Sequence, residues 1–153
     1  MIAIIDYNAG NITSVARALG NIGQEFVITD DTKMLDSASR VIFPGVGAAG
    51  EAVAYLKEKK LDAWLKGCFA SGKPLLGICL GTQIILEASE ENDTRCIGLV
   101  AGSTRRFPDH LEEDGRNLKI PHMGWNSVSF LRSHPVFTGI PAEAEFYFVH
   151  SYY

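Results

Sequence analysis

The sequence predicts an α/β protein with a doubly wound, mostly parallel sheet, flanking helices and a β-rich second half. Short apolar runs alternate with helical patterns over the first half of the chain, which is the order of elements in such a sheet. Because helical segments separate the strands, right-handed crossovers and parallel pairing are expected. From Cys96 onward the chain holds short β-prone segments. The length of 153 residues predicts a single domain over residues 1–153.

Four short apolar runs predict the strands of the parallel sheet. They are rich in Ile, Val and Leu, as expected for strands buried on both faces. The runs cover residues 2–5, 26–28, 41–43 and 75–78. In the second half, strands are expected at residues 97–100, 118–120, 127–130 and 146–149.

Helices are predicted between these strands. After a turn at residues 8–11, apolar residues spaced by three or four positions place one helical face over residues 12–22. Gly23 then takes the left-handed position that ends a helix. The Asp-Asp-Thr segment at residues 30–32 can cap a short helix through Leu35. Further helical patterns cover residues 48–59, 61–69 and 81–88.

Composition and charge exclude several classes of function. With 14 basic and 18 acidic residues, the net charge is −4, so a nucleic-acid partner is not expected. The longest apolar stretch, residues 74–86, is too short to cross a membrane. Three unclustered cysteines, Cys68, Cys79 and Cys96, fit neither a disulfide framework nor a zinc site. We therefore expect a cytoplasmic protein with no metal and no membrane partner.

Residues 77–81, Gly-Ile-Cys-Leu-Gly, form the segment that carries chemistry. They join the fourth predicted strand to a helix, and a nucleophile at such a turn is strained and needs neighbours without side-chain bulk. The positive end of the helix would favour the thiolate of Cys79. The N–H of Leu80 would be free to donate to an oxyanion. The alternative for Cys79 is a buried structural cysteine, which is the usual state of a free cysteine.

A second glycine-rich segment, Pro44-Gly45-Val46-Gly47, follows the third predicted strand. In a doubly wound sheet it lies at the carboxyl edge, on the same side as Cys79, where ligands bind. Glycines there allow backbone N–H groups to face a substrate. An ordinary strand-to-helix turn is the alternative interpretation.

The remaining cysteines and the histidines are weaker candidates. Cys68 lies on an apolar helical face and Cys96 precedes a strand, so both are assigned to the core. Of the four histidines, His122 and His150 adjoin β-prone aromatic segments and are better placed for a site than the other two. Their spacing does not suggest a metal site.

Residues 77–83, Gly-Ile-Cys-Leu-Gly-Thr-Gln, resemble the nucleophile elbow of class I (triad) glutamine amidotransferases. Other segments narrow the resemblance to the glutaminase-subunit family of imidazole glycerol phosphate synthase. These segments are Asp6-Tyr7-Asn8-Ala9-Gly10-Asn11, Pro44-Gly45-Val46-Gly47, Pro121-His122-Met123-Gly124-Trp125-Asn126 and Phe148-Val149-His150-Ser151-Tyr152. The similarity runs over the whole chain and implies a flavodoxin-like fold.

The resemblance implies how the site would work. Cys79 would attack the side-chain amide of glutamine, form a thioester and release ammonia. Backbone N–H groups around Gly47 and at Leu80 would stabilise the oxyanion. No cofactor is implied. The positions that would hold glutamine are Gly45, Val46, Gln83, Ser151 and Tyr152.

A protein partner is also implied by the resemblance. Ammonia would pass to a cyclase subunit with a (β/α)₈ barrel, which makes imidazole glycerol phosphate in histidine biosynthesis. Met123, Trp125 and Tyr147 lie in segments that would face this cyclase.

The sequence departs from the family pattern at the catalytic triad. The family completes the triad with the histidine and glutamate of a later His-Pro-Glu-like segment, and this sequence contains no His-Pro-Glu. His134-Pro135 is followed by Val136 and precedes the Phe-Val-His-Ser-Tyr segment, so it cannot supply that histidine. We therefore expect a domain that is incomplete at its C-terminal side, with little or no glutaminase activity by itself.

Two other functions stay open from the sequence. One is a thiol hydrolase or stress-type protein with an elbow cysteine, whose base would come from the histidines present. The other is a non-catalytic relic or binding module, in which replacing Cys79 would have no measurable effect.

Overall fold

The computed structural model describes residues 1–8, 11–113 and 115–153. Two compact units make up this structure, Met1–Arg105 and Arg106–Tyr153. The expected turn at residues 8–11 includes Ala9 and Gly10, which lie outside the described residues.

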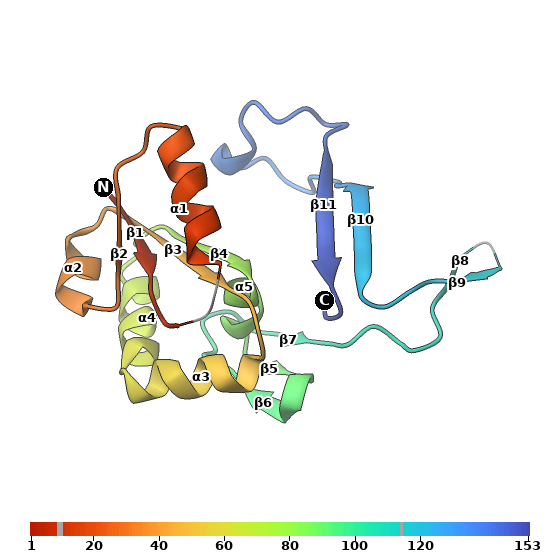
Figure 1. Ribbon diagram of the computed structural model, residues 1–153, viewed down its shortest axis with the longest axis horizontal. Coiled ribbons are helices and arrows are strands. Elements are labelled where there is room, and N and C mark those ends of the chain that lie inside the picture. Colours follow the sequence, from red (N-terminus) through yellow and green to blue (C-terminus); the bar gives the residue numbers. More distant parts are fainter. Residues whose placement is uncertain (9–10, 114) are drawn as a thin grey trace. The chain divides into compact units, whose positions relative to one another are not determined.

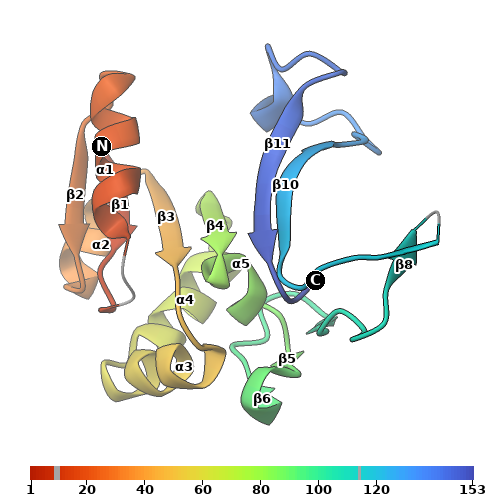
Figure 2. The same ribbon diagram turned by 45° about the vertical axis from the view of Figure 1, so that its right-hand side comes forward.

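The first unit is built on a parallel sheet, as predicted. Its strands lie in the order β2-β1-β3-β4, with β4 at one edge (Figures 1 and 2). Their bounds are β1 Ile2–Ile5, β2 Phe26–Thr29, β3 Arg40–Gly45 and β4 Leu75–Cys79. β3 continues through Pro44, two residues past its expected end. Proline fits there because pairing with β1 stops at Ile42, so the missing N–H of Pro44 costs no hydrogen bond on that side.

Five α-helices in the described part of the first unit connect and flank these strands. They are α1 Ile12–Asn21, α2 Thr32–Ser37, α3 Ala49–Glu58, α4 Leu61–Ala70 and α5 Leu80–Ile84. Gly23, with φ +70°, follows α1 as expected for a left-handed terminating residue. The side chain of Asp31 caps α2 by accepting the N–H of Lys33 at 2.9 Å.

The helix after Cys79 is shorter than predicted. It ends at Ile84. The carbonyl groups of residues 84–86 accept N–H groups from residues 97–99, so they are not available to N–H groups of a further helical turn. The N–H of Gly98, for example, donates to Leu86 at 2.7 Å. The same contacts explain why the strand expected at residues 97–100 does not form. A small three-stranded sheet lies nearby, with β5 Ala88–Ser89, β6 Thr94–Arg95 and β7 Ser103–Thr104, and the short 3₁₀ helix η1 covers Glu91–Asp93.

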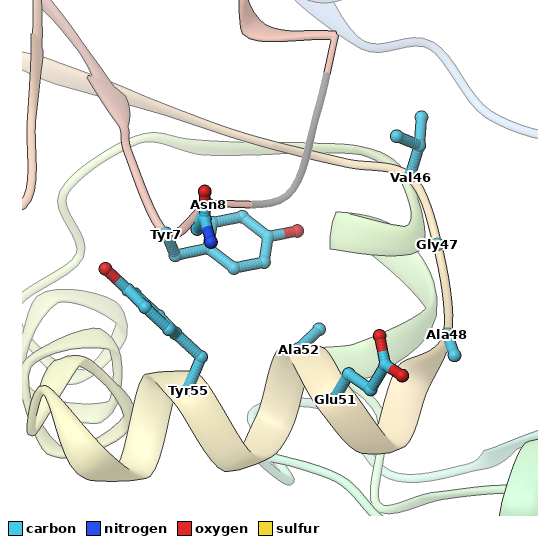
Figure 3. Close-up of a pocket in the computed structure, with 8 residues that line it drawn as sticks. All are labelled: Tyr7, Asn8, Val46, Gly47, Ala48, Glu51, Ala52 and Tyr55. Carbon is cyan, nitrogen blue, oxygen red and sulfur yellow. The ribbon is translucent and has the colours of Figure 1, made fainter.

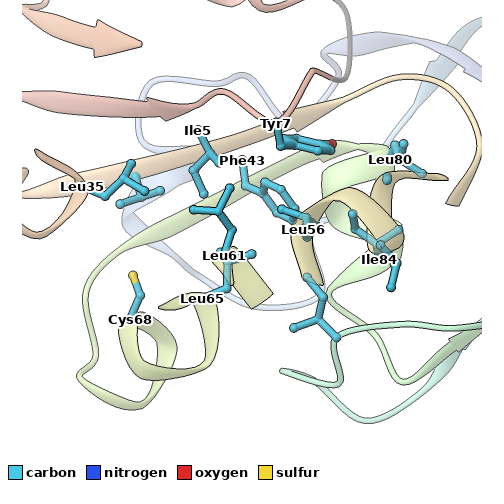
Figure 4. Close-up of a cluster of buried hydrophobic side chains, with 14 of the residues drawn as sticks. Ile5, Tyr7, Leu35, Phe43, Leu56, Leu61, Leu65, Cys68, Leu80 and Ile84 are labelled. Carbon is cyan, nitrogen blue, oxygen red and sulfur yellow. The ribbon is translucent and has the colours of Figure 1, made fainter. Parts of the chain in front are cut away.

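The sheet separates two hydrophobic clusters because successive side chains of a strand point to opposite faces. On one face, Ile5 and Phe43 pack with the buried side chains of α3, α4 and α5 (Figure 4). On the other face, Ile4 and Ile42 pack against Leu19 of α1. The larger cluster holds the start of α5 in place through Leu80, which is 2% exposed.

The second unit is an antiparallel β structure. Its strands are β8 Glu112–Glu113, β9 Arg116–Asn117, β10 His122–Ser127 and β11 Glu145–His150, with the 3₁₀ helix η2 at Pro135–Phe137. β10 pairs with β11 over their whole lengths, which confirms the strand expected at residues 146–149. The strands expected at residues 118–120 and 127–130 are wrong. A strand at residues 118–120 is disfavoured because Pro121, which follows, has no N–H for pairing. The pairing of Trp125 with Tyr147 places β10 at residues 122–127, before the segment expected at residues 127–130.

No helix in the described part of the chain combines the length and apolar character needed to cross a bilayer.

Candidate active site

Cys79 lies at a sharp bend between β4 and α5. Its backbone has φ +53° and ψ −115°, a region that residues with side chains rarely adopt. The side chain is exposed, whereas Cys68 and Cys96 are buried. A buried structural role for Cys79 is therefore wrong, and the core assignment of the other two cysteines is confirmed.

The glycines on either side of Cys79 are required by the packing of the bend. A Cβ on Gly77 would lie 2.9 Å from the backbone of Thr82. A Cβ on Gly81 would overlap the carbonyl oxygen of Phe43 in β3. Since neither backbone can move without disturbing the sheet, α5 can approach the strands this closely only with glycine at both positions.

The Pro44-Gly45-Val46-Gly47 segment lies beside this bend, because Gly45 pairs with Cys79 in the register of β3 and β4. Val46 is 44% exposed, and Gly47 has φ +106°. Leu80 is the first residue of α5, where backbone N–H groups have no partner within the helix. The structure therefore brings an exposed thiol, a helix N–H and a glycine-rich loop together at the carboxyl edge of the sheet.

A family profile described as "Glutamine amidotransferase class-I" matches residues 3–153. The chain belongs to the class-I glutamine amidotransferase family. This confirms the family and the fold class expected from the sequence, and it identifies the chain as an enzyme by family. It also favours an amidotransferase over an unrelated thiol hydrolase with a similar elbow.

Relatives and solved structures support this assignment. The chain is 54% identical to "Imidazole glycerol phosphate synthase subunit HisH" of Desulfovibrio desulfuricans, over 100% of this chain and 71% of the relative. It is 50% identical to the protein of the same name from Methylococcus capsulatus, over 99% of this chain and 72% of the relative. A structure titled "Crystal structure of glutamine amidotransferase" has a TM-score of 0.60 at 17% identity, covering 69% of this chain and 57% of that one, which supports the fold.

Gln83 lies on α5 of this amidotransferase, one turn after Leu80. Its side chain is partly buried, and its carbonyl accepts the hydroxyl of Thr104 at 3.3 Å. Ser151 and Tyr152 belong to the second unit, where the Ser151 carbonyl accepts the N–H of Phe107 at 3.0 Å. The contribution of these three residues to glutamine binding stays a prediction.

The expected partner-facing residues of the amidotransferase are all exposed. Met123, Trp125 and Tyr147 are exposed by 60%, 66% and 54%. Trp125 and Tyr147 are directly paired across β10 and β11, with ring centroids 5.6 Å apart. An exposed aromatic pair suits a protein interface, and this role also stays a prediction.

His122 and His150 form a continuous hydrogen-bonded chain in the second unit. His150 Nδ1 lies 2.8 Å from the carbonyl of Tyr152, and His150 Nε2 lies 3.1 Å from His122 Nδ1. The amide of Asn126 completes the chain at 3.0 Å from His122 Nε2. When both rings are neutral, each therefore carries its proton on Nδ1, since a backbone carbonyl can only accept.

The other two histidines are not part of this hydrogen-bonded series of side chains. His134 Nδ1 accepts the N–H of Val136 at 3.2 Å and caps η2. His110 is exposed, and so is Glu112, which follows it with the spacing of a His-x-Glu triplet. Among the described residues, no group of three or more His, Cys, Asp or Glu side chains could hold a metal ion.

Tyr7 is a residue near the elbow that was not singled out from the sequence. Its side chain is 1% exposed and packs on Phe43, with ring centroids 5.1 Å apart. Its hydroxyl lies where a Cβ on Gly45 would be, and it has no hydrogen-bond partner among the described residues. Tyr7 also lines a cavity of about 200 Å³ with Val46, Gly47 and residues of α3 (Figure 3). The available sequence signal was its place in the Asp6–Asn11 segment, directly after β1.

Stability of this amidotransferase is expected to fall at alkaline pH. Burial, and next the nearby Cys79, raise the pKa of the Tyr7 phenol above its ordinary value of about 10. A group whose folded pKa is raised contributes its stability fully below the unfolded pKa and loses it as pH rises toward the folded pKa. Thermal unfolding midpoints between pH 7 and 11 should therefore fall above about pH 10 in the wild type, and less in Tyr7→Phe. Parallel curves for the two proteins would contradict this expectation.

Proposed function

We propose that this amidotransferase is the glutaminase subunit of imidazole glycerol phosphate synthase. It hydrolyses glutamine and passes the ammonia to a cyclase subunit with a (β/α)₈ barrel, in histidine biosynthesis. The observation that carries the proposal is the exposed Cys79 at a strained bend, paired in register with Gly45 of the glycine-rich loop. The names of relatives about 50% identical over the full chain support the choice of synthase.

The proposed chemistry begins at the sulfur of Cys79. The thiolate attacks the amide carbon of glutamine, and the carbonyl π electrons move onto oxygen. The N–H groups of Leu80 and Gly47 stabilise that oxyanion. Its collapse breaks the C–N bond, and the nitrogen leaves as ammonia after gaining, through solvent, the proton that the thiol released. Water then attacks the thioester, which releases glutamate and restores the thiol.

Substrate and partner contacts are proposed from the same positions. Gly45, Val46 and Gln83, on the first unit, hold glutamine near Cys79. Ser151 and Tyr152, on the second unit, are proposed as glutamine-binding positions from the family resemblance alone. Met123, Trp125 and Tyr147 contribute to the surface that binds the cyclase.

The general base is the part of this mechanism that the sequence does not supply in the family's usual form. Because the sequence contains no His-Pro-Glu segment, it lacks the histidine that the family uses as the proton acceptor for the cysteine. We therefore propose that the chain by itself turns glutamine over slowly or not at all, while its thiol still reacts with electrophiles.

Labelling with a glutamine analogue tests this proposal. An analogue that carries a chloromethyl ketone in place of the amide should add once to the chain, at Cys79, as located by mass spectrometry. Glutamine in excess should slow the reaction, since both compounds occupy the same site. Cys68 and Cys96 should stay unmodified, because burial raises the pKa of both thiols and shields them.

The enantiomeric analogue provides the control, since it has the same reactivity and the wrong shape for a glutamine site. Equal labelling by both enantiomers, without protection by glutamine, would show a reactive thiol that is not part of a glutaminase.

A further inference from the structure

Three segments of the first unit converge at Gly45. A Cβ at this position would overlap the hydroxyl of Tyr7, and it would lie 3.1 Å from Leu80 Cβ and 3.2 Å from the N atom of Gly81. The phenol of Tyr7 therefore occupies the space that a side chain at position 45 would fill, next to the first residues of α5. Because Gly45 pairs with Cys79, this hydroxyl lies under the strand pair that carries the sulfur.

The hydroxyl of Tyr7 has no role in the resting fold that phenylalanine could not fill. The ring supplies the packing against Phe43, while the oxygen is buried and finds no hydrogen-bond partner in the part of the chain that the structure describes. Buried polar groups without partners are rare in native proteins, since each loses its hydrogen bonds to water without compensation. Such a group at Gly45, the residue paired with the nucleophile Cys79, is consistent with a donor that is used when charge appears.

We propose that Tyr7 is a positioning residue for Cys79, whose buried hydroxyl donates a hydrogen bond toward the sulfur when Cys79 is a thiolate. This inference rests on the proposed function, in which Cys79 is the nucleophile. Burial, and next Cys79, raise the pKa of the Tyr7 phenol, so the oxygen keeps the proton that it must donate.

Other titratable groups surround Tyr7. Glu51 and Tyr55 of α3 line the same cavity, and Figure 3 shows the hydroxyl of Tyr7 on the side of Val46 and Gly47, away from Tyr55. Asp6 precedes Tyr7, and its carboxylate accepts the N–H of Asn8 at 3.3 Å. Tyr55 therefore offers a matched control, since it is a phenol in the same cavity whose hydroxyl points away from Val46 and Gly47.

The test compares the wild type, Tyr7→Phe and Tyr55→Phe by the rate at which iodoacetamide modifies Cys79 between pH 6 and 10. Loss of a hydrogen bond to a thiolate lowers the thiolate fraction at neutral pH by about tenfold. The more basic sulfur regains about two- to threefold in intrinsic reactivity. Tyr7→Phe should thus react about three- to fivefold more slowly at pH 7 and about twofold faster at pH 10, so that the two profiles cross.

Two further measurements make the result decisive. The unfolding midpoint of Tyr7→Phe at pH 7 should equal or exceed that of the wild type, because the substitution removes an unsatisfied buried hydroxyl. Tyr55→Phe should label like the wild type. If Tyr7→Phe is less stable and its labelling profile is unchanged, the hydroxyl is merely structural and the inference is wrong. Absence of Cys79 labelling in the wild type would instead contradict the proposed function itself.

Discussion

Replacing Cys79 with alanine is expected to abolish addition of the glutamine analogue to the chain, together with whatever slow glutamine hydrolysis the wild type shows. Cys79 is the exposed cysteine of the chain, and its strained backbone presents the side chain to solvent at the bend between β4 and α5. Alanine keeps the fold but removes the atom that forms the thioester. Mass spectrometry of the labelled chain measures the first effect, and glutamate release measures the second.

The matched control for this experiment is Cys68→Ala. Cys68 is buried in α4, on the apolar face of the helix, and is not part of the proposed site. Its removal should lower stability modestly and leave the rate of Cys79 labelling in the folded protein within about twofold of the wild type. Glutamine turnover retained in Cys79→Ala would remove the basis for a cysteine thioester mechanism, whatever the family of the chain.

Gly81→Ala is expected to destabilise the first unit by about 3 kcal/mol or more. The added methyl group would overlap the carbonyl oxygen of Phe43, which belongs to a strand paired on both sides. Relief requires α5 to move away from the sheet, which would also displace Leu80 from the core. Urea unfolding followed by circular dichroism measures the loss, and slower labelling of Cys79 by the glutamine analogue should accompany it.

Gly67→Ala tests whether this effect comes from the contact and not from the substitution itself. Gly67 lies inside α4, and a Cβ there meets no atom within 4 Å. Alanine should stabilise the helix by about 0.5–1 kcal/mol, since glycine loses more backbone freedom on folding. A similar loss of stability in both variants would show that Gly81 has no special packing constraint.

Local sequence signals were sufficient for most of the first unit. The strands at residues 2–5, 26–28, 41–43 and 75–78 were correct within two residues at either end, because buried parallel strands appear as short apolar runs between turn residues. The bend at Cys79 was also predictable, since flanking glycines report where two backbones approach closely.

Features set by contacts between distant segments were not predictable in this way. The end of α5 depends on N–H groups from residues 97–99, and the position of β10 depends on its register with β11. Tyr7 escaped notice because its relation to the elbow depends on the order β1-β3-β4, in which residues far apart in sequence become neighbours. The spacing of apolar residues along the sequence does not predict which strands become neighbours in the sheet.

The sheet face that carries α1 ends at β4 with Leu76 and Ile78, which are 48% and 38% exposed. α1 covers the neighbouring Ile42, but this outer strip stays in contact with water. Molecular chaperones hold chains through apolar segments of this kind. The yield of folded protein in a cell should therefore depend on chaperone capacity, and a polar residue at position 76 should weaken that dependence.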